Sequence, residues 1–376
     1  MRAKSKVHIF LSCVAACLCA IPVAERFAAS KEQRPPWISR EMFNFDRFFS
    51  WVSRPLAAYG VSVSPGDVVI GYGGWDFLGD THQDSISSHR RSATPADEER
   101  NSRIISAGIA WDLWLREKGV RVFRIMVVPD KQSVYGEYAP NWAKTSPDAP
   151  IERLKSLPEK GVHVFLAPAL LSAARSRTER LYYMHDSHWN ELGAWLGYRA
   201  FAESVREHAP EVAWLPAEFF TVDGTTERRG GDMSLFLRLQ AWDREEVPVL
   251  KPAPADELST VGRAEELPDI LEQGKPARLL RRHTPGALNA AKVLWLTDSF
   301  GDSLKPFMER TFADLAILHW DKALASPRNL VGLVERERPQ FVFVTVIERM
   351  ARRTAFVRVP PDGKKAEGAA DEALTY

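Results

Sequence analysis

Two serines follow a short apolar run at residues 293–296 that predicts a buried strand. Ser299 comes directly after this run, whereas Ser303 lies about one helical turn further along. A serine at the carboxyl end of a strand exposes its hydroxyl, and the backbone N–H groups of Ser299 and Gly301 can bind an oxyanion there. We therefore predict Ser299 as a nucleophile and these two amides as its oxyanion donors. The alternative is that both serines only cap the following helix.

A serine hydroxyl becomes reactive beside a base, and the segment His185-Asp186-Ser187-His188 offers one. Asp186 can accept the Nδ1–H of His188, which leaves Nε2 to take the serine proton. We predict His188 as general base and Asp186 as its orienting acid, with His185 as a spare. The alternatives are a polar loop that caps the next helix and a zinc site at His185, Asp186 and His188. The tight spacing disfavours zinc, so we predict no metal.

Three further residues are candidates for substrate binding. Trp189 follows the predicted base, and Lys131 and Tyr135 follow the carboxyl end of an apolar run at residues 122–128. Aromatic rings can stack on sugars, and a lysine can bind a polar substrate. The alternative for Lys131 and Tyr135 is a loop lysine and a packed tyrosine, and most of the twelve tryptophans are expected in the core. No cofactor is expected for this chemistry.

The rest of the chain alternates apolar runs with helical periodicity. Helices are predicted around residues 41–55, 104–115 and 192–205, and strands at residues 68–70, 122–128, 163–171, 293–296 and 341–347. This alternation predicts an α/β fold with a mostly parallel central sheet flanked by helices. Sites in such sheets lie at the carboxyl ends of the strands, where Ser299 is expected.

The N-terminus has the pattern of an export signal. Basic residues precede an apolar run at residues 7–24, so residues 1–30 are predicted as a signal peptide or an N-terminal membrane anchor. All three cysteines, Cys13, Cys17 and Cys19, lie in this segment, and the remaining residues can form no disulfide. The residues before Cys17 also loosely resemble a lipoprotein cleavage site.

The body is predicted as one catalytic domain at residues 31–355. Residues 243–287, rich in Pro, Glu and Arg, are predicted as a surface insertion, and residues 356–376 as a disordered tail. The net charge of +1 gives no basic excess, which argues against a nucleic-acid partner.

Taken in order, the motifs resemble the alginate O-acetyltransferase group of SGNH-hydrolase-like proteins, also called the DHHW family. The matching pieces span most of residues 40–350. They are Gly73-Gly74-Trp75-Asp76-Phe77, Val127-Val128-Pro129-Asp130-Lys131 with Tyr135, Asp186-Ser187-His188-Trp189, Gly231-Asp232-Met233, Asp298-Ser299-Phe300 and Glu348-Arg349. The chain departs from the family pattern at Thr297, where Gly often stands, and at Asp76, where Leu is usual.

This resemblance implies a three-layer SGNH-hydrolase-like fold and a triad of Asp186, His188 and Ser299. It also implies a periplasmic protein, soluble after signal cleavage or anchored to the inner membrane. The acceptor would be an exported polysaccharide, alginate-like or another exopolysaccharide. The acetyl donor would be delivered by a membrane-bound O-acyltransferase.

Three functions remain open at this point. The first is an O-acetyltransferase that forms an acyl-serine and passes the acyl group to a sugar hydroxyl. The second is a carbohydrate acetyl esterase, in which water takes the place of the sugar. The third is a polysaccharide-binding scaffold without catalysis.

Overall fold

The computed structural model describes residues 46–252, 258–272 and 274–361, together with residues 11, 12, 16 and 19. The predicted signal or anchor at residues 1–30 therefore lies outside the described residues apart from those four positions. The predicted tail lies outside them from residue 362 onward. Among the described helices, none has both the length and the apolar character that a membrane span requires.

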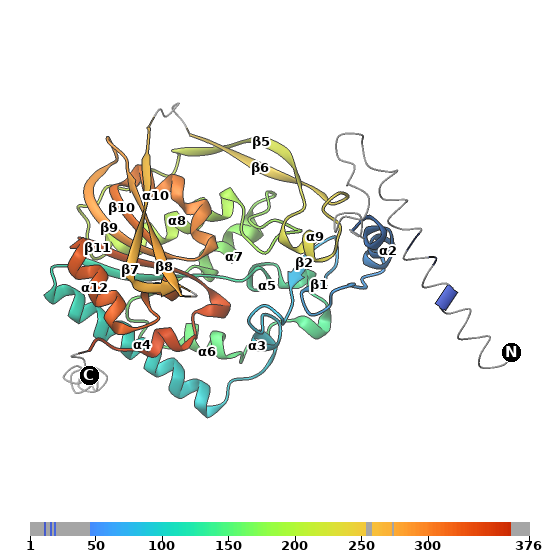
Figure 1. The fold of residues 1–376 in the computed structure, drawn as a ribbon, viewed down its shortest axis with the longest axis horizontal. Coiled ribbons are helices and arrows are strands. Elements are labelled where there is room, and N and C mark those ends of the chain that lie inside the picture. Colours follow the sequence, from blue (N-terminus) through green and yellow to red (C-terminus); the bar gives the residue numbers. More distant parts are fainter. Residues whose placement is uncertain are drawn as a thin grey trace.

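A seven-stranded sheet forms the middle of the molecule (Figure 1). Its strand order is β4-β3-β11-β9-β10-β8-β7, in which the first five strands run parallel and the last two pair antiparallel. This confirms the predicted α/β fold with a mostly parallel sheet. The strands are β3 Val122–Val128, β4 His163–Phe165, β7 Val261–Glu272, β8 Lys275–His283, β9 Asn289–Thr297, β10 Phe312–His319 and β11 Phe341–Ile347.

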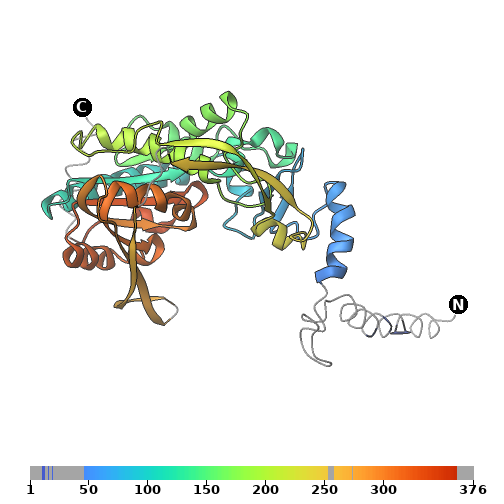
Figure 2. The ribbon, with the colours of Figure 1, turned by 90° about the horizontal axis from the view of Figure 1, so that it is seen from above.

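Helices flank the sheet, and two small antiparallel pairs lie beside it (Figures 1 and 2). The pairs are β1 Val68–Ile70 with β2 Asp76–Leu78, and β5 Phe220–Arg229 with β6 Arg244–Pro252. The helices are α2 Asp46–Ala58, α3 Ser87–Arg90, α4 Pro95–Glu117, α5 Lys131–Val134, α6 Pro150–Ser156, α7 Ala167–Ser176, α8 Glu191–Arg206, α9 Asp232–Phe236, α10 Lys305–Thr311, α11 Trp320–Ala323 and α12 Pro327–Glu337.

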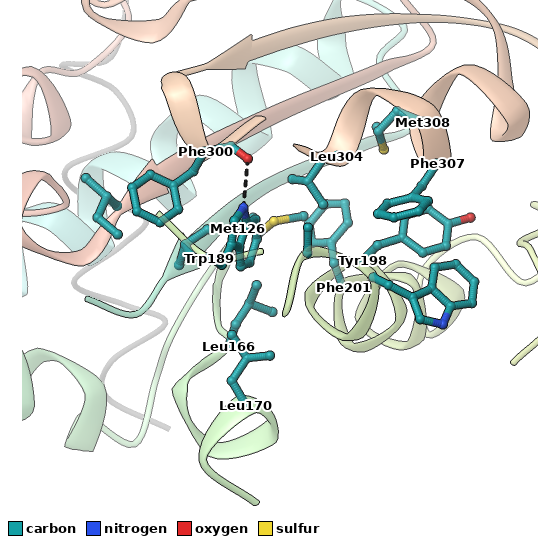
Figure 3. Packing of buried hydrophobic residues seen from close by; sticks show 14 of the residues in the cluster. Met126, Leu166, Leu170, Trp189, Tyr198, Phe201, Phe300, Leu304, Phe307 and Met308 are labelled. Atoms are coloured by element: carbon teal, nitrogen blue, oxygen red, sulfur yellow. Dashed lines mark hydrogen bonds between the residues drawn. The ribbon is translucent and has the colours of Figure 1, made fainter. Parts of the chain in front are cut away.

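The central strands are buried on both faces, which explains their continuous apolar runs. Every residue of β3 and β11 is buried. Along β9 the side chains alternate between two cores: Trp295 packs in the core that contains Phe201 of α8, and Leu296 packs in the core that contains Ile104 of α4. Figure 3 shows side chains of the first core packed between α8 and α10, among them Phe201 and Phe307. Burial on both faces fixes β9, and therefore the turn that follows it.

One predicted strand is partly wrong. The apolar run at residues 163–171 forms strand β4 only up to Phe165, and helix α7 starts at Ala167. Pro168 lies in the first turn of α7, a position that suits proline because its missing N–H has no partner there. A short buried run does not distinguish strand from helix by periodicity alone, which explains the error.

Residues 243–287 are more regular than their composition predicts. They contain β6, β7 and β8, and β8 pairs with β10 at the edge of the central sheet. Figure 2 shows the β7–β8 hairpin extending beyond the rest of the sheet. Leu267 and Leu279 of this hairpin are buried. Edge and hairpin strands leave many side chains in water, so their charged residues hide the strand pattern.

The ordered body continues past the predicted boundary at residue 355. Phe356 is buried in the second core, and the carbonyl of Arg358 accepts a hydrogen bond from Trp111 Nε1 at 2.8 Å. These contacts secure the last described residues to α4.

Candidate active site

Ser299 lies at the carboxyl end of β9, at the start of the short 3₁₀ helix Ser299–Leu304. The preceding Asp298 holds this turn with both carboxylate oxygens. Oδ1 accepts the N–H of Phe300 at 3.0 Å, and Oδ2 accepts the N–H of Ile347 at the end of β11 at 2.9 Å. Burial raises the pKa of Asp298, while these two donors oppose the rise by stabilising the carboxylate. The turn that carries Ser299 is thus tied to the neighbouring strand β11.

The turn accommodates Thr297 because Gly301 has no side chain. A Cβ on Gly301 would overlap Thr297 Oγ1, which donates a hydrogen bond to the Asp298 carbonyl at 3.0 Å. The departure from the family pattern at Thr297 is therefore matched by a glycine four residues later.

His188 and Asp186 lie on the loop before α8. A β-bridge between Tyr182 and Trp189 closes this loop, and the N–H of Tyr183 bonds the carbonyl of His188 at 3.3 Å. Asn190 then caps α8 by accepting the N–H of Gly193 at 3.0 Å, so the helix start fixes the end of the loop.

The structure brings the three predicted catalytic residues together. His188 Nε2 lies 2.8 Å from Ser299 Oγ, and His188 Nδ1 lies 2.7 Å from Asp186 Oδ1. The same Asp186 oxygen accepts the backbone N–H of His188 at 3.1 Å. The His188 ring packs 4.7 Å from the ring of Phe300, and its side chain is 28% exposed. This arrangement can pass a proton from the serine to the imidazole.

The second oxygen of Asp186 is also occupied. Oδ2 accepts a hydrogen bond from Arg228 Nη2 at 2.8 Å. Burial by itself would raise the pKa of Asp186, but the bonds from His188 and Arg228 outweigh it and hold that pKa well below its usual range. Asp186 is therefore a carboxylate at neutral pH, and it can stabilise a protonated His188.

One of the two predicted oxyanion donors is already engaged. The N–H of Gly301 bonds the carbonyl of Asp298 at 3.1 Å, so Gly301 is not available as a donor in this conformation, contrary to the prediction. The N–H of Phe300 is likewise bonded to Asp298. Within the described part of the chain, the N–H of Ser299 makes no such bond. Of these three N–H groups, that of Ser299 is therefore the one that can donate to an oxyanion.

Comparisons with known proteins agree with this architecture. A family model described as "SGNH hydrolase-like domain, acetyltransferase AlgX" matches residues 68–271, more than half of the chain. The chain belongs to this family. The resemblance predicted from the motifs is thereby confirmed.

Solved structures share the fold of this AlgX-family domain at low identity. PatB1 of Bacillus cereus, solved with a sulfonyl adduct, is 14% identical with a TM-score of 0.52, over 75% of this chain and 97% of that chain. A DHHW family protein of Eubacterium siraeum is 18% identical with a TM-score of 0.51, over 83% and 97%. A comparison with curated proteins gives no significant match.

Trp189 does not line a substrate groove in this AlgX-family domain. Its side chain is completely buried, and its Nε1 donates to the carbonyl of Phe300 at 3.1 Å (Figure 3). The structure therefore contradicts the predicted substrate contact. Trp189 instead connects the His188 loop to the turn that follows Ser299.

Lys131 and Tyr135 are also buried and have other roles than the predicted one. Lys131 Nζ donates to the carbonyls of Asp76 at 2.8 Å and Met184 at 3.0 Å, and burial lowers its pKa to about 8. The hydroxyl of Tyr135 accepts the N–H of Leu181 at 2.9 Å. Both side chains hold the segment that leads to Asp186, so neither is free to bind a substrate.

Asp76, the second departure from the family pattern, has a partner in this chain. Its Oδ2 lies 2.7 Å from Nδ1 of His185, the histidine that the sequence analysis left as a spare. The Asp76 side chain is 6% exposed and that of His185 is 16% exposed. His185 is thus committed to a second acid and does not compete with His188.

Acids and histidines gather in three places among the described residues, with ligand atoms within 4.8 Å of one another: Asp186, His188 and Asp232; Asp76, His185 and Asp243; His89, Asp130 and Glu348. In the last group Lys155 bonds Glu348 at 2.7 Å, and Arg349 pairs with Asp130. Lys155 and Arg349 therefore already balance the charges of Glu348 and Asp130. This third group connects the residues that follow β3 to those that follow β11.

Arg228 is a site residue that the sequence analysis missed. It lies within a strand that is mostly exposed, and no motif precedes it. Gly231 entered the sequence analysis only as part of a family motif. The structure explains why a glycine stands there, because a Cβ at this position would overlap Asp186 Oδ2.

Proposed function

We propose that this protein is an O-acetyltransferase that carries an acetyl group on Ser299 and transfers it to a hydroxyl of an exported polysaccharide. The observation that carries the proposal is the continuous chain of contacts from Ser299 through His188 to Asp186, at 2.8 and 2.7 Å. Membership of an acetyltransferase family supports the acyl chemistry.

In the first half-reaction Ser299 Oγ attacks the carbonyl carbon of an acetyl donor, and His188 Nε2 takes the serine proton. The oxygen of the tetrahedral intermediate becomes negative, and the N–H of Ser299 is its backbone donor. The intermediate then collapses, His188 returns the proton to the leaving group, and acetyl-Ser299 remains.

In the second half-reaction a sugar hydroxyl binds beside His188, which removes its proton as the oxygen attacks acetyl-Ser299. Collapse of this intermediate releases the sugar ester, and the proton returns from His188 to Ser299. Asp186 stabilises the imidazolium in both steps because it stays ionised. Water in place of the sugar would give hydrolysis, the reaction of an esterase.

The family resemblance suggests where this reaction takes place. We propose a periplasmic enzyme, released from its signal or anchored through residues 1–30, that acts on alginate or another exopolysaccharide. A membrane-bound O-acyltransferase is the proposed source of the acetyl group.

Acyl transfer can be tested with a chromogenic acetyl ester in the presence and absence of oligosaccharide acceptors. The proposal expects a sugar ester as product and an added acetyl mass on the Ser299 peptide. Release of acetate alone would instead identify an esterase. Ser299→Ala should lose several orders of magnitude in rate, because nucleophile, base and acid act as a unit.

Ser303→Ala is the matched control, since Ser303 lies in the same 3₁₀ helix, and among the described hydrogen bonds the serine partner of His188 Nε2 is Ser299. It should keep near wild-type turnover. A Ser299→Ala protein that turns over normally, or an acetyl mass on Ser303, would remove the basis of the proposal.

A further inference from the structure

The β5–β6 hairpin reaches the catalytic carboxylate from the side opposite His188. Arg228, the second-last residue of β5, donates through Nη2 to Asp186 Oδ2 at 2.8 Å, whereas His188 uses Oδ1. The hairpin is a separate two-stranded unit that runs along the molecule toward α9 (Figure 1). A strand outside the central sheet thus contributes a cation to the site.

The guanidinium of Arg228 is fixed by two neighbours. Its carbon lies 3.8 Å from the ring centroid of Tyr183, on the loop that carries Asp186. Glu245, its partner in register on β6, places Oε1 3.7 Å from Arg228 Nη1 and is almost fully buried. The other Glu245 oxygen accepts the N–H of Met184 at 2.6 Å. Arg228 and the catalytic loop are therefore held by the same buried carboxylate.

We propose that Arg228 is a positioning residue of the catalytic centre, which orients Asp186 and sets the pH range in which His188 acts as a base. This inference rests on the proposed function. With both Asp186 oxygens bonded, the carboxylate cannot rotate away from the imidazole. Arg228 also shares the negative charge of Asp186, so less of that charge stabilises the protonated ring.

Other charged groups surround the pair and stay in place when Arg228 is changed. Asp232 of α9 has an oxygen 3.9 Å from His188 Nδ1. Asp186 additionally interacts electrostatically with Lys131 of α5 and with Tyr183. None of these donates to Asp186 Oδ2 among the described contacts, so the bond from Arg228 is not replaced by a neighbour.

The sign of the pH effect follows from the charges. Without the guanidinium, Asp186 stabilises the imidazolium of His188 more strongly, and the ring keeps its proton to higher pH. Because the reaction needs the neutral ring, the acid limb of the pH–rate profile should move up by about half a unit or more. The turnover number should fall about tenfold or more, since general-base catalysis contributes ~10²–10⁴-fold.

The test compares Arg228→Gln, Arg228→Lys and wild type in pH profiles of kcat and KM with a small acetyl ester. Lys251→Gln is the matched control, because it removes one positive charge from the same hairpin at a pair more than half exposed. Arg228→Gln should show the shifted limb and lower kcat with little change in KM. Arg228→Lys should return the acid limb of the pH–rate profile part of the way to its wild-type position. Lys251→Gln should match wild type.

NMR titration of the His188 ring, assigned with His188→Gln, gives a readout that needs no turnover. Arg228→Gln should move this titration to higher pH. An unchanged titration and an unchanged acid limb in folded Arg228→Gln would overturn the inference, even if its melting temperature falls. Normal turnover by Ser299→Ala in the same series would overturn the proposed function instead, so the two failures are distinguishable.

Discussion

The indole of Trp189 donates a hydrogen bond to the carbonyl of Phe300 at 3.1 Å, in a completely buried contact. Trp189 follows the proposed base His188, and Phe300 follows the proposed nucleophile Ser299. One hydrogen bond therefore joins two segments separated by 111 residues, each adjacent to a reacting side chain. We therefore expect this connection to help maintain the 2.8 Å spacing between His188 Nε2 and Ser299 Oγ.

Trp189→Phe should reduce activity more than its stability loss explains. The substitution leaves the Phe300 carbonyl without its donor, which costs about 1–3 kcal/mol for a buried polar group, and it opens space beside the ring of Phe300. Equilibrium unfolding and kcat/KM, measured below the melting temperature, check this expectation. Trp142→Phe, at a side chain 55% exposed, is the control and should change neither.

Gly231→Ala should disable the site through a single methyl group. The added Cβ would overlap Asp186 Oδ2, the oxygen that binds Arg228, so the carboxylate must turn or the backbone must shift. We expect at least about a tenfold loss of kcat, because catalytic geometry tolerates little displacement.

Gly332→Ala is the control for this glycine, since a Cβ at Gly332 in α12 meets no atom within 4 Å. Alanine should even stabilise that helix by about 0.5–1 kcal/mol. Equal activities for the two variants would contradict the steric role of Gly231.

Glu348 should make stability depend on pH in the acid range. Burial would raise the pKa of Glu348, but Lys155 and His89 outweigh this effect and hold it well below the ordinary value of 4.5. A carboxyl group with a lowered pKa contributes stability above its unfolded-state value, and this contribution is lost as pH falls toward the folded-state value. Wild type should therefore lose stability progressively below about pH 4.5.

Glu348→Gln should be less stable at neutral pH, because Lys155 loses its buried partner, and its stability should decline less steeply with acid. Denaturant unfolding between about pH 3 and pH 7 measures both slopes. Parallel curves for the two proteins would show that Glu348 is not responsible for the acid dependence.

The parts of the site that could be predicted from sequence are those with local signals. Ser299 follows a short apolar run that predicts a strand, and Asp186 stands two residues before His188, so a local motif indicated each candidate. The parallel sheet was predictable because strands buried on both faces are apolar throughout, as in β3 and β11.

What could not be predicted depends on tertiary contacts. Arg228 is one of many arginines until the hairpin brings it to Asp186. Trp189, next to the proposed base His188, has the chemistry of a sugar-stacking residue, and only its burial assigns it to the core. The Gly301 amide was a reasonable oxyanion donor until the turn closed it onto Asp298.

The position of β9 in the sheet determines when the catalytic pair can form during synthesis. Both neighbours of β9, the strands β10 and β11, come later in the chain, and β11 ends at Ile347, whose N–H bonds Asp298. A growing chain that already contains Ser299 and His188 still lacks the strands that hold the serine in place. The proposed contact between His188 and Ser299 can therefore be held in place only after residues 341–347 have been synthesised.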